Sequence, residues 1–232
     1  MSDRWLEYFG DQNSDNPEWL RTAVDHWSFM QHLYGEIQRT VPKGSRILDI
    51  GCGMGYSDLY LGSYGYKVTG IDNDHRIVDR AVTFGRQLGI DTTFRQEDAF
   101  DLSGEYGKHD LVFSVGVLEH FNREVTIQLL QEQARCASYV LICIPTKYTI
   151  YAAPITDERI YRIPQLRDIV SDAGLNVVRS FGYGDVTATT KQIWLKRLLP
   201  HAVYRVMQNR GFAFNICVIG ESKTFQPATD IK

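Results

Sequence analysis

One stretch decides the fold of this chain: Arg46-Ile47-Leu48-Asp49-Ile50-Gly51-Cys52-Gly53-Met54-Gly55-Tyr56. It begins as a short apolar run, which is typical of a strand buried on both faces of a parallel sheet. Glycine then occupies every second position, and an apolar helical pattern follows. Residues without a Cβ permit positive φ and let a ligand approach the backbone closely. We therefore expect a strand, a tight turn and a helix that border a site for a nucleotide-like ligand.

The glycine spacing indicates which ligand this turn suits. Its pattern, Gly-x-Gly-x-Gly, departs from the Gly-x-Gly-x-x-Gly turn of dinucleotide-binding oxidoreductases. A pyrophosphate needs the amides of a helix N-terminus aimed at it, whereas a ligand without phosphates needs only room beside the turn. Asp49 precedes the turn, where a carboxylate disfavours a phosphate and favours an ammonium group. The pattern favours a cationic ligand over an NAD-type dinucleotide, although a turn that merely joins a strand to a helix is a further alternative.

Four segments resemble the class I S-adenosylmethionine-dependent methyltransferases in order and spacing: residues 47–56, Gly70-Ile71-Asp72, Gln96-Glu97-Asp98-Ala99-Phe100 and residues 110–121. The resemblance implies an α/β fold with a single Rossmann-like, seven-stranded, mostly parallel sheet, helices on both faces and an antiparallel last strand. It also implies an N-terminal helical cap and a late helical insertion. The implied cofactor is S-adenosylmethionine, with S-adenosylhomocysteine as product. The implied activity is methylation of a small-molecule acceptor on oxygen or nitrogen.

Acidic residues at the ends of two further strands fit a nucleoside. Asp72 ends an apolar run, and a carboxylate there can accept both hydroxyls of a ribose, although it could instead cap the helix that follows. In the resembled family the acid at the position of Asp98 binds the adenine amino group and the backbone N–H of Ala99 meets the ring; a surface-loop acid is the alternative. The cofactor-binding residues that we expect are Asp49, Gly51, Cys52, Gly53, Gly55, Asp72, Asn73, Asp98, Ala99, Ser114, Val115 and Leu118.

The catalytic residues are harder to predict, because methyl transfer from a sulfonium mainly requires alignment and a dry cavity. His120 ends the sequence Val-Leu-Glu-His and is a candidate general base, since its pKa lies near working pH; a structural role is the alternative. Tyr148 and Tyr151 follow the predicted fifth strand and could orient a substrate or pack on the protein. Tyr8 and Phe9 are candidate lid residues.

Composition excludes several classes of protein. The 232 residues carry a net charge of −3 and 44% hydrophobic residues, so nothing calls for nucleic acid, and no apolar run approaches the ~20 residues that span a bilayer. Four scattered cysteines predict reduced thiols, and six histidines without ligand spacing predict no metal site. The N-terminus shows no secretory signal, so we expect a cytoplasmic protein.

We expect one methyltransferase domain over residues 1–232. It would comprise an N-terminal helical cap (1–45), a cofactor-binding core (46–185), a basic helical insertion (186–210) and a final strand (211–222). The helix of the cap would begin at Asn16-Pro17.

Charge is unevenly distributed along the chain. Residues 186–220 contain no Asp or Glu but five cations, Lys191, Lys196, Arg197, Arg205 and Arg210, which leaves −8 for the rest. The simplest interpretation is two helices, divided at Pro200, with a solvated basic face and a buried side formed by Ile193, Trp194, Leu195, Leu198, Leu199, Val203 and Val206. Alternatively, this segment of about residues 191–210 binds an anionic substrate or makes peripheral contact with an anionic membrane. Methylation of RNA or protein has this segment as its only support, and a cofactor-binding protein without catalysis is a further alternative.

Overall fold

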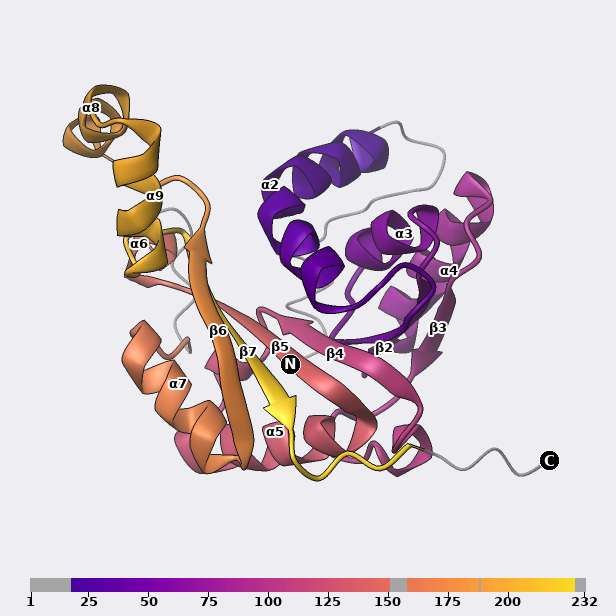
Figure 1. Cartoon of the computed structure of the whole chain (residues 1–232). Helices are drawn as coiled ribbons and strands as arrows, with labels where there is room; N and C mark the ends of the chain where they lie inside the picture. Colours follow the sequence, from indigo (N-terminus) through magenta and orange to yellow (C-terminus); the bar gives the residue numbers. More distant parts are fainter. Residues whose placement is uncertain (1–17, 151–157, 188, 228–232) are drawn as a thin grey trace.

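A seven-stranded sheet in the order β3-β2-β1-β4-β5-β7-β6 forms the centre of the molecule. The structure is a computed structural model that describes residues 18–150, 158–187 and 189–227 (Figure 1). All strand pairs are parallel except the two that involve β7, which runs antiparallel to both β5 and β6. This confirms the predicted α/β fold. The strands are β1 (Arg46–Ile50), β2 (Lys67–Asp72), β3 (Thr93–Gln96), β4 (His109–Val115), β5 (Ala137–Pro145), β6 (Leu175–Tyr183) and β7 (Asn215–Ser222).

Helices cover both faces of the sheet (Figure 1). Buried residues of α2 and α3 pack on one face against alternate residues of the central strands, and α4 packs against both helices at their edge. Buried residues of α5 and α7 pack on the other face. The bounds of these helices are α2 (Glu18–Thr40), α3 (Tyr56–Ser63), α4 (His75–Leu88), α5 (Arg123–Cys136) and α7 (Ile163–Asp172). Short elements complete the fold: η1 (Ser103–Glu105), η2 (Leu118–His120), α6 (Lys147–Ile150), α8 (Thr190–Leu198) and α9 (His201–Asn209).

Element boundaries agree with the sequence where a local signal marks them. Gly89 ends α4 with φ of 64°, the left-handed conformation that glycine adopts readily at the end of a helix. No such signal separates α5 from β5, because Cys136, the last residue of α5, and Ala137, the first residue of β5, are both apolar and buried. The predicted helix start at Asn16-Pro17 lies outside the described residues, as do the lid candidates Tyr8 and Phe9 and the loop residue Tyr151.

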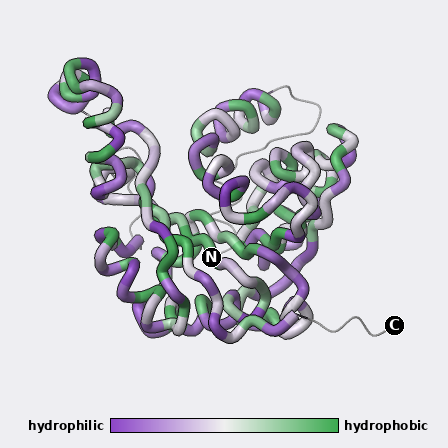
Figure 2. Tube along the Cα trace, viewed as in Figure 1, coloured by the Kyte–Doolittle hydropathy of each residue, from purple (hydrophilic) through white to green (hydrophobic). Residues whose placement is uncertain are grey.

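The expected buried side of the late helices is wrong. None of the nine residues of α8, all of them described, is buried. Trp194 is 54% exposed and Leu198 76% exposed. The two helices rise away from the sheet, and hydrophobic positions recur along them at a distance from the core (Figures 1 and 2). Helical spacing showed which residues share a face, but it could not show that no described element covers that face.

The base of α9 is attached to the sheet by polar contacts. The Tyr204 hydroxyl accepts the Val186 N–H at 3.1 Å, and the Gln208 side-chain amide donates to the Gly184 carbonyl at 3.1 Å. Both side chains are buried. Within the described ranges, no helix combines the length and the apolar character that crossing a bilayer requires.

Candidate functional site

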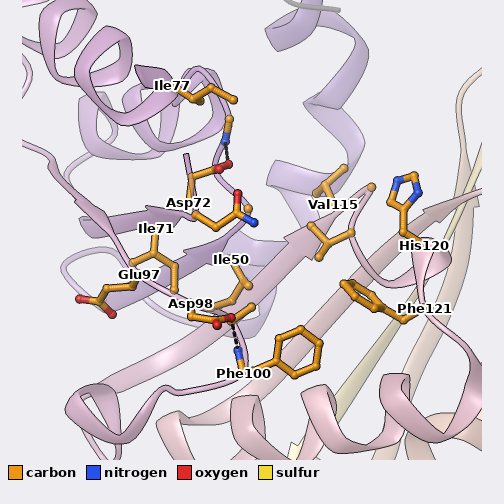
Figure 3. A pocket seen from close by; sticks show the side chains of 16 residues that line it. Ile50, Ile71, Asp72, Ile77, Glu97, Asp98, Phe100, Val115, His120 and Phe121 are labelled. Carbon is orange, nitrogen blue, oxygen red and sulfur yellow. Dashed lines mark hydrogen bonds between the residues drawn. The ribbon is translucent and has the colours of Figure 1, made fainter. Parts of the chain in front are cut away.

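A cavity of about 200 Å³ lies at the carboxyl ends of β1, β2 and β4 (Figure 3). Strands β2 and β3 lie on one side of β1 and β4 lies on the other, so the strand order reverses beside β1. Open α/β sheets bind ligands at such a switch point. Its lining comes from the ends of four strands and from one residue of α4. The lining residues are Ile50, Gly51, Gly53, Ile71, Asp72, Asn73, Ile77, Glu97, Asp98, Ala99, Phe100, Val115, Gly116, Val117, His120 and Phe121.

The glycine turn exposes its backbone to this cavity. Gly51 and Gly53 line it with φ of 73° and 55°. The N–H groups of Gly51 and Cys52 donate to the Ile71 carbonyl, which fixes the turn on β2. A Cβ on Gly51 would lie 2.6 Å from a methyl group of Val117, so the turn and the segment after β4 approach each other closely.

The third glycine of the turn has a different role. Gly55 is not among the described residues that line the cavity. Its φ is 72°, and a Cβ there would lie 2.6 Å from two ring atoms of Phe94. Gly55 therefore makes room for the ring of Phe94 rather than for a ligand.

Asp72 lies at the wall formed by β2. Its carboxylate accepts the backbone N–H groups of Gly53 and Asp74, each at 3.1 Å. Burial raises its pKa, although the backbone donors act in the opposite direction. The N-cap of α4 is Asp74, whose side chain accepts the Arg76 N–H at 3.0 Å. Asp72 therefore does not cap α4, and its carboxylate borders the cavity beside Asn73.

The segment after β3 forms the next wall. Asp98 and Ala99 line the cavity, and the Asp98 carboxylate accepts the Phe100 N–H at 3.0 Å. The rings of Phe100 and Phe121 meet edge to face with centroids 5.5 Å apart (Figure 3). Sequence reasoning did not assign Glu97, Phe100 or Phe121 to the site. All three belong to segments that carried the resemblance, residues 96–100 and 110–121, so position in those segments was the available signal.

The lining has an acidic character. Three carboxylates, those of Asp72, Glu97 and Asp98, belong to it, and none of the described lining residues is Lys or Arg. Such a surface repels a phosphate and attracts a cation. These carboxylate acceptors suit the hydroxyl and amino donors of a nucleoside that carries a positively charged group.

Four predicted site residues lie behind the lining. Asp49, Cys52, Ser114 and Leu118 are at most 9% exposed and are not among the described residues that line the cavity. Asp49 faces the carboxyl group of Asp58 in α3, not the cavity. Asp58 was missed because an acid in the first turn of a helix is an ordinary surface feature. The remaining predicted residue of this strand end, Val115, does line the cavity.

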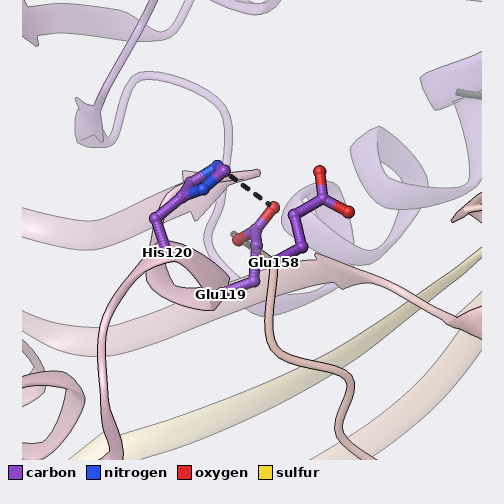
Figure 4. Close-up of side chains that lie close together, drawn as sticks. All are labelled: Glu119, His120 and Glu158. Atoms are coloured by element: carbon purple, nitrogen blue, oxygen red, sulfur yellow. Dashed lines mark ion pairs between the residues drawn. The ribbon is translucent and has the colours of Figure 1, made fainter. Parts of the chain in front are cut away.

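His120 lies on the opposite wall from Asp72 and Asp98 (Figure 3). Its Nε2 is 4.0 Å from Oε1 of Glu119, which is 2% exposed. Arg159 holds this segment through its backbone N–H, which donates to the Glu119 carbonyl at 2.8 Å, and its guanidinium, which donates to the His120 carbonyl at 3.0 Å. Both contacts bring Glu158 beside the pair (Figure 4).

Glu119, His120 and Glu158 each place one potential ligand atom within 4.8 Å of the others. The sequence did not reveal this group, because Glu158 is distant in the chain and no motif links it to His120. The group places one imidazole and two carboxylates close together, with Glu119 nearest to the imidazole (Figure 4). Its use as a metal site is not assigned, and the expected absence of a metal stays a prediction.

Tyr148 is not among the described residues that line the cavity. Its ring packs edge to face on Phe212 with centroids 5.0 Å apart, and the Lys147 ammonium lies 5.1 Å from its centroid. Tyr148 could have oriented a substrate or packed on the protein; in the structure its ring packs on the protein.

Comparisons with known proteins agree with this geometry. Residues 47–138 match the family described as methyltransferase domain. The chain is 38% identical over 133 residues to a 2-methyl-6-phytyl-1,4-hydroquinone methyltransferase of Synechocystis sp., covering 51% of this chain and 41% of that protein. It is 34% identical over 83 residues to a ubiquinone biosynthesis O-methyltransferase of Caulobacter sp., covering 35% and 33%. The matched regions thus span about two fifths of the first relative and one third of the second.

A solved structure extends the likeness to nearly the whole chain. Magnesium protoporphyrin IX methyltransferase from Synechocystis, crystallised with S-adenosylhomocysteine, superposes with a TM-score of 0.65 over 95% of this chain and 94% of that one, at 19% identity. At that identity the likeness concerns the fold. Residues 47–138 thus match a methyltransferase domain. The chain as a whole has the α/β fold of S-adenosylmethionine-dependent methyltransferases.

Proposed function

We propose that the protein transfers the methyl group of S-adenosylmethionine to a small-molecule acceptor, on oxygen or nitrogen. The observation that carries the proposal is the acidic cavity beside a Cβ-free turn. It offers carboxylates to hydroxyl and amino groups and no cation, among its described residues, to a phosphate. This disfavours the NAD-type alternative. Relatives named for quinone-related compounds support a ring-bearing molecule as the first acceptor class to test.

Each wall of the cavity has a role in holding the cofactor. The carboxylate of Asp72 would accept the ribose hydroxyls, which are donors placed for a bidentate contact. Asp98 would accept the adenine amino group, with the Ala99 backbone beside the ring. Gly51 and Gly53 would let the methionine part lie against bare backbone. When bound, the cofactor supplies a methyl group on a sulfonium, whose leaving group needs no protonation.

The chain contributes alignment and a proton acceptor at the other end of the cavity. His120 lines it beside Phe121, and its Nε2 lies close to the buried Glu119 carboxylate. A hydroxyl acceptor must lose its proton as the new bond forms, and the imidazole of His120, whose buried Nε2 faces Glu119, is the group that we place there. The neighbouring carboxylate stabilises the imidazolium that results. Phe100 and Phe121 exclude water from the same end.

Two measurements test the proposal. Calorimetric titration compares S-adenosylhomocysteine with NADH, and we expect binding of the first alone. Transfer of an isotope-labelled methyl group is then measured with phenolic and amine acceptors, with bulk tRNA and with a protein extract. Binding of NADH in place of S-adenosylhomocysteine would refute the methyltransferase assignment. Transfer to tRNA or protein alone would replace the small-molecule acceptor, and binding without any transfer would favour a non-catalytic role.

We also propose that residues 1–232 act as one domain and that the protein works in the cytoplasm. The cysteines Cys52, Cys136, Cys143 and Cys217 are all free and buried, which supports a reducing compartment.

A further inference from the structure

The helices α8 and α9 expose large apolar side chains beside cations. Trp194 and Leu198 are one helical turn apart in α8 and are 54% and 76% exposed. Lys191 lies one turn before Trp194 and is exposed on the same face. The Arg197 guanidinium lies 5.9 Å from the centroid of the Trp194 ring. An apolar stripe with cations at its borders is typical of helices that lie in a membrane interface.

The second helix continues this pattern. Val203 and Val206 of α9 are one turn apart and are 45% and 49% exposed. Arg210, which follows the helix, is also exposed. The opposite side of α9 is the one that holds the helix to the protein, through the buried Tyr204 and Gln208. The exposed valines therefore face away from the attachment.

The charge of this region is not neutralised by the rest of the protein. Lys196 pairs with Asp185, and Arg205 lies against His32. No ion pair to a described carboxylate involves Lys191, Arg197 or Arg210, and residues 186–220 contain no acid. The rest of the chain carries −8. The segment that carries both helices therefore has a net positive charge, whereas the rest of the chain is net negative.

We propose that α8 and α9 form a docking surface for an anionic lipid bilayer. The docking surface consists of Lys191, Trp194, Arg197, Leu198, Val203, Val206 and Arg210. The cations would meet lipid phosphates while Trp194 and Leu198 enter the boundary between headgroups and acyl chains. A bilayer is the occupant that binds both the cations and the apolar side chains of this surface.

Other occupants use only one half. A nucleic acid would contact the cations but gain nothing from exposed aliphatic side chains such as Leu198. A second copy of the chain, paired symmetrically through this surface, would bring the three cations of each copy's surface together, and the surface itself contains no acid. These occupants are outcomes of the test below.

The docking surface lies at the edge of the sheet that also holds the cavity. Tyr183 ends β6 and Asn215 begins β7, and the two are paired; Asn215 is also paired with Pro145, the last residue of β5. The segment that carries α8 and α9 therefore leaves and re-enters the sheet at the carboxyl ends of the parallel strands. Docking would bring that edge of the protein toward the bilayer. The proposal does not depend on the methyltransferase activity, because lipid binding is measured without turnover.

Flotation with unilamellar vesicles tests the proposal directly. The full chain is mixed with vesicles of phosphatidylcholine alone or of phosphatidylcholine with phosphatidylglycerol. We expect it to float with the mixed vesicles only and to be released by salt. The emission of Trp194 should shift to shorter wavelength on binding, and Trp194→Phe should remove this shift while leaving flotation largely intact.

Matched variants separate the two halves of the surface. The double variant Lys191→Glu with Arg197→Glu should weaken binding at least ~25-fold. Each cation near an anionic bilayer contributes about fivefold to the affinity, and two cations are removed. Trp194→Ser with Leu198→Ser should weaken it at least ~10-fold, since two large apolar groups are lost. The charge control is Arg21→Glu with Arg86→Glu, and the apolar control is Val178→Ser, all at exposed positions on other elements. Both controls should bind like the unmodified chain.

Several results would overturn the proposal. They are absence of flotation with the mixed vesicles, equal loss in the charge control, or dimerisation that Trp194→Ser with Leu198→Ser abolishes. Retention by tRNA but not by vesicles would assign the surface to nucleic acid instead. Thermal unfolding of every variant checks the fold, which substitutions at these exposed positions should leave intact.

Discussion

The carboxyl groups of Asp49 and Asp58 face each other in the interior, directly behind the glycine turn. Asp58 is fully buried, and burial raises its pKa to about 7. Burial raises the pKa of Asp49 well above its usual range, and the negative charge of Asp58 adds to the effect. Asp58 also packs on the bare backbone of Gly70, where a Cβ would lie 2.6 Å from its Oδ1. Folding therefore favours the protonated form of both carboxyl groups.

Replacing Asp58 with Asn should stabilise the protein in a pH-dependent manner. An acid with a raised pKa binds its proton more tightly when folded, so stability falls as pH rises from ~4, the unfolded value, through about 7. Asp58→Asn removes this loss while keeping the shape. We expect a gain on the order of 2 kcal/mol at pH 8, shrinking toward pH 5, in urea unfolding without cofactor. Asp79→Asn, at an exposed position of α4, should give no such trend; an equal gain at both pH values would contradict the explanation.

Replacing Asp72 with Asn should weaken cofactor binding. The carboxylate borders the cavity, and hydrogen bonds to a charged group are worth ~1.5–3 kcal/mol. We expect the Kd for S-adenosylhomocysteine to rise roughly 10- to 100-fold by calorimetry. Asp91→Asn, at an exposed position outside the cavity, serves as control. Unchanged affinity in Asp72→Asn would remove this residue from the site.

Replacing Gly55 with Ala should destabilise the fold rather than act on the ligand. The left-handed backbone costs ~1–2 kcal/mol and the contact with Phe94 adds ~1–3 kcal/mol. Adding Phe94→Leu should restore part of the loss, because the shorter side chain leaves space for the new Cβ. The free energy of unfolding is measured for both variants and for Phe94→Leu alone. If the losses of unfolding free energy in Gly55→Ala and Phe94→Leu simply added in the double variant, contact with the Phe94 ring would not be the cause of the destabilisation.

Replacing His120 with Gln should lower turnover without weakening cofactor binding. A general base contributes typically ~10²- to 10⁴-fold. We expect kcat for a hydroxyl acceptor to fall within that range while the Kd for S-adenosylhomocysteine stays within about twofold, the spread that we allow for loss of one neutral contact. His75→Gln, at an exposed position in the first turn of α4, is the matched control. A parallel fall in affinity would make His120 a binding residue instead.

Removal of divalent cations should leave turnover unchanged. Displacement at a sulfonium carbon needs no Lewis acid, because the leaving group is already activated by its charge. Activity is compared before and after dialysis against EDTA. A metal site at Glu119, His120 and Glu158 would be shown by two results together. Activity would be lost after EDTA and restored by Mg²⁺ or Zn²⁺ in the unmodified chain, and the same addition would not restore it in Glu158→Gln.

Features encoded by neighbouring residues were the predictable part of this structure. The glycine turn, the strands that flank it and the acid at the end of β2 are each specified within a few positions, so they were predicted to within a residue or two. The fold class was predicted from the resemblance of four segments to a known family, and the observed strand order confirms it.

Features that depend on distant partners were not predictable from the sequence. Glu158 reaches His120 only because Arg159 is bonded to the backbone of Glu119 and His120. Gly55 serves Phe94, which belongs to β3, and Asp58 is buried only because Gly70 in β2 leaves it space. The exposure of α8 is of the same kind, since amphipathic spacing predicts a covered face but does not supply the cover.

The separation of charge between residues 186–220 and the rest of the chain gives the molecule a permanent electric dipole. The electric field of a charged surface exerts a torque on this dipole, and the torque turns the protein before contact. The torque acts over roughly one Debye length, which is ~8 Å at physiological ionic strength. Encounters at low salt should therefore be pre-oriented, and those at high salt random, with the association rate changing more steeply with salt than the dissociation rate.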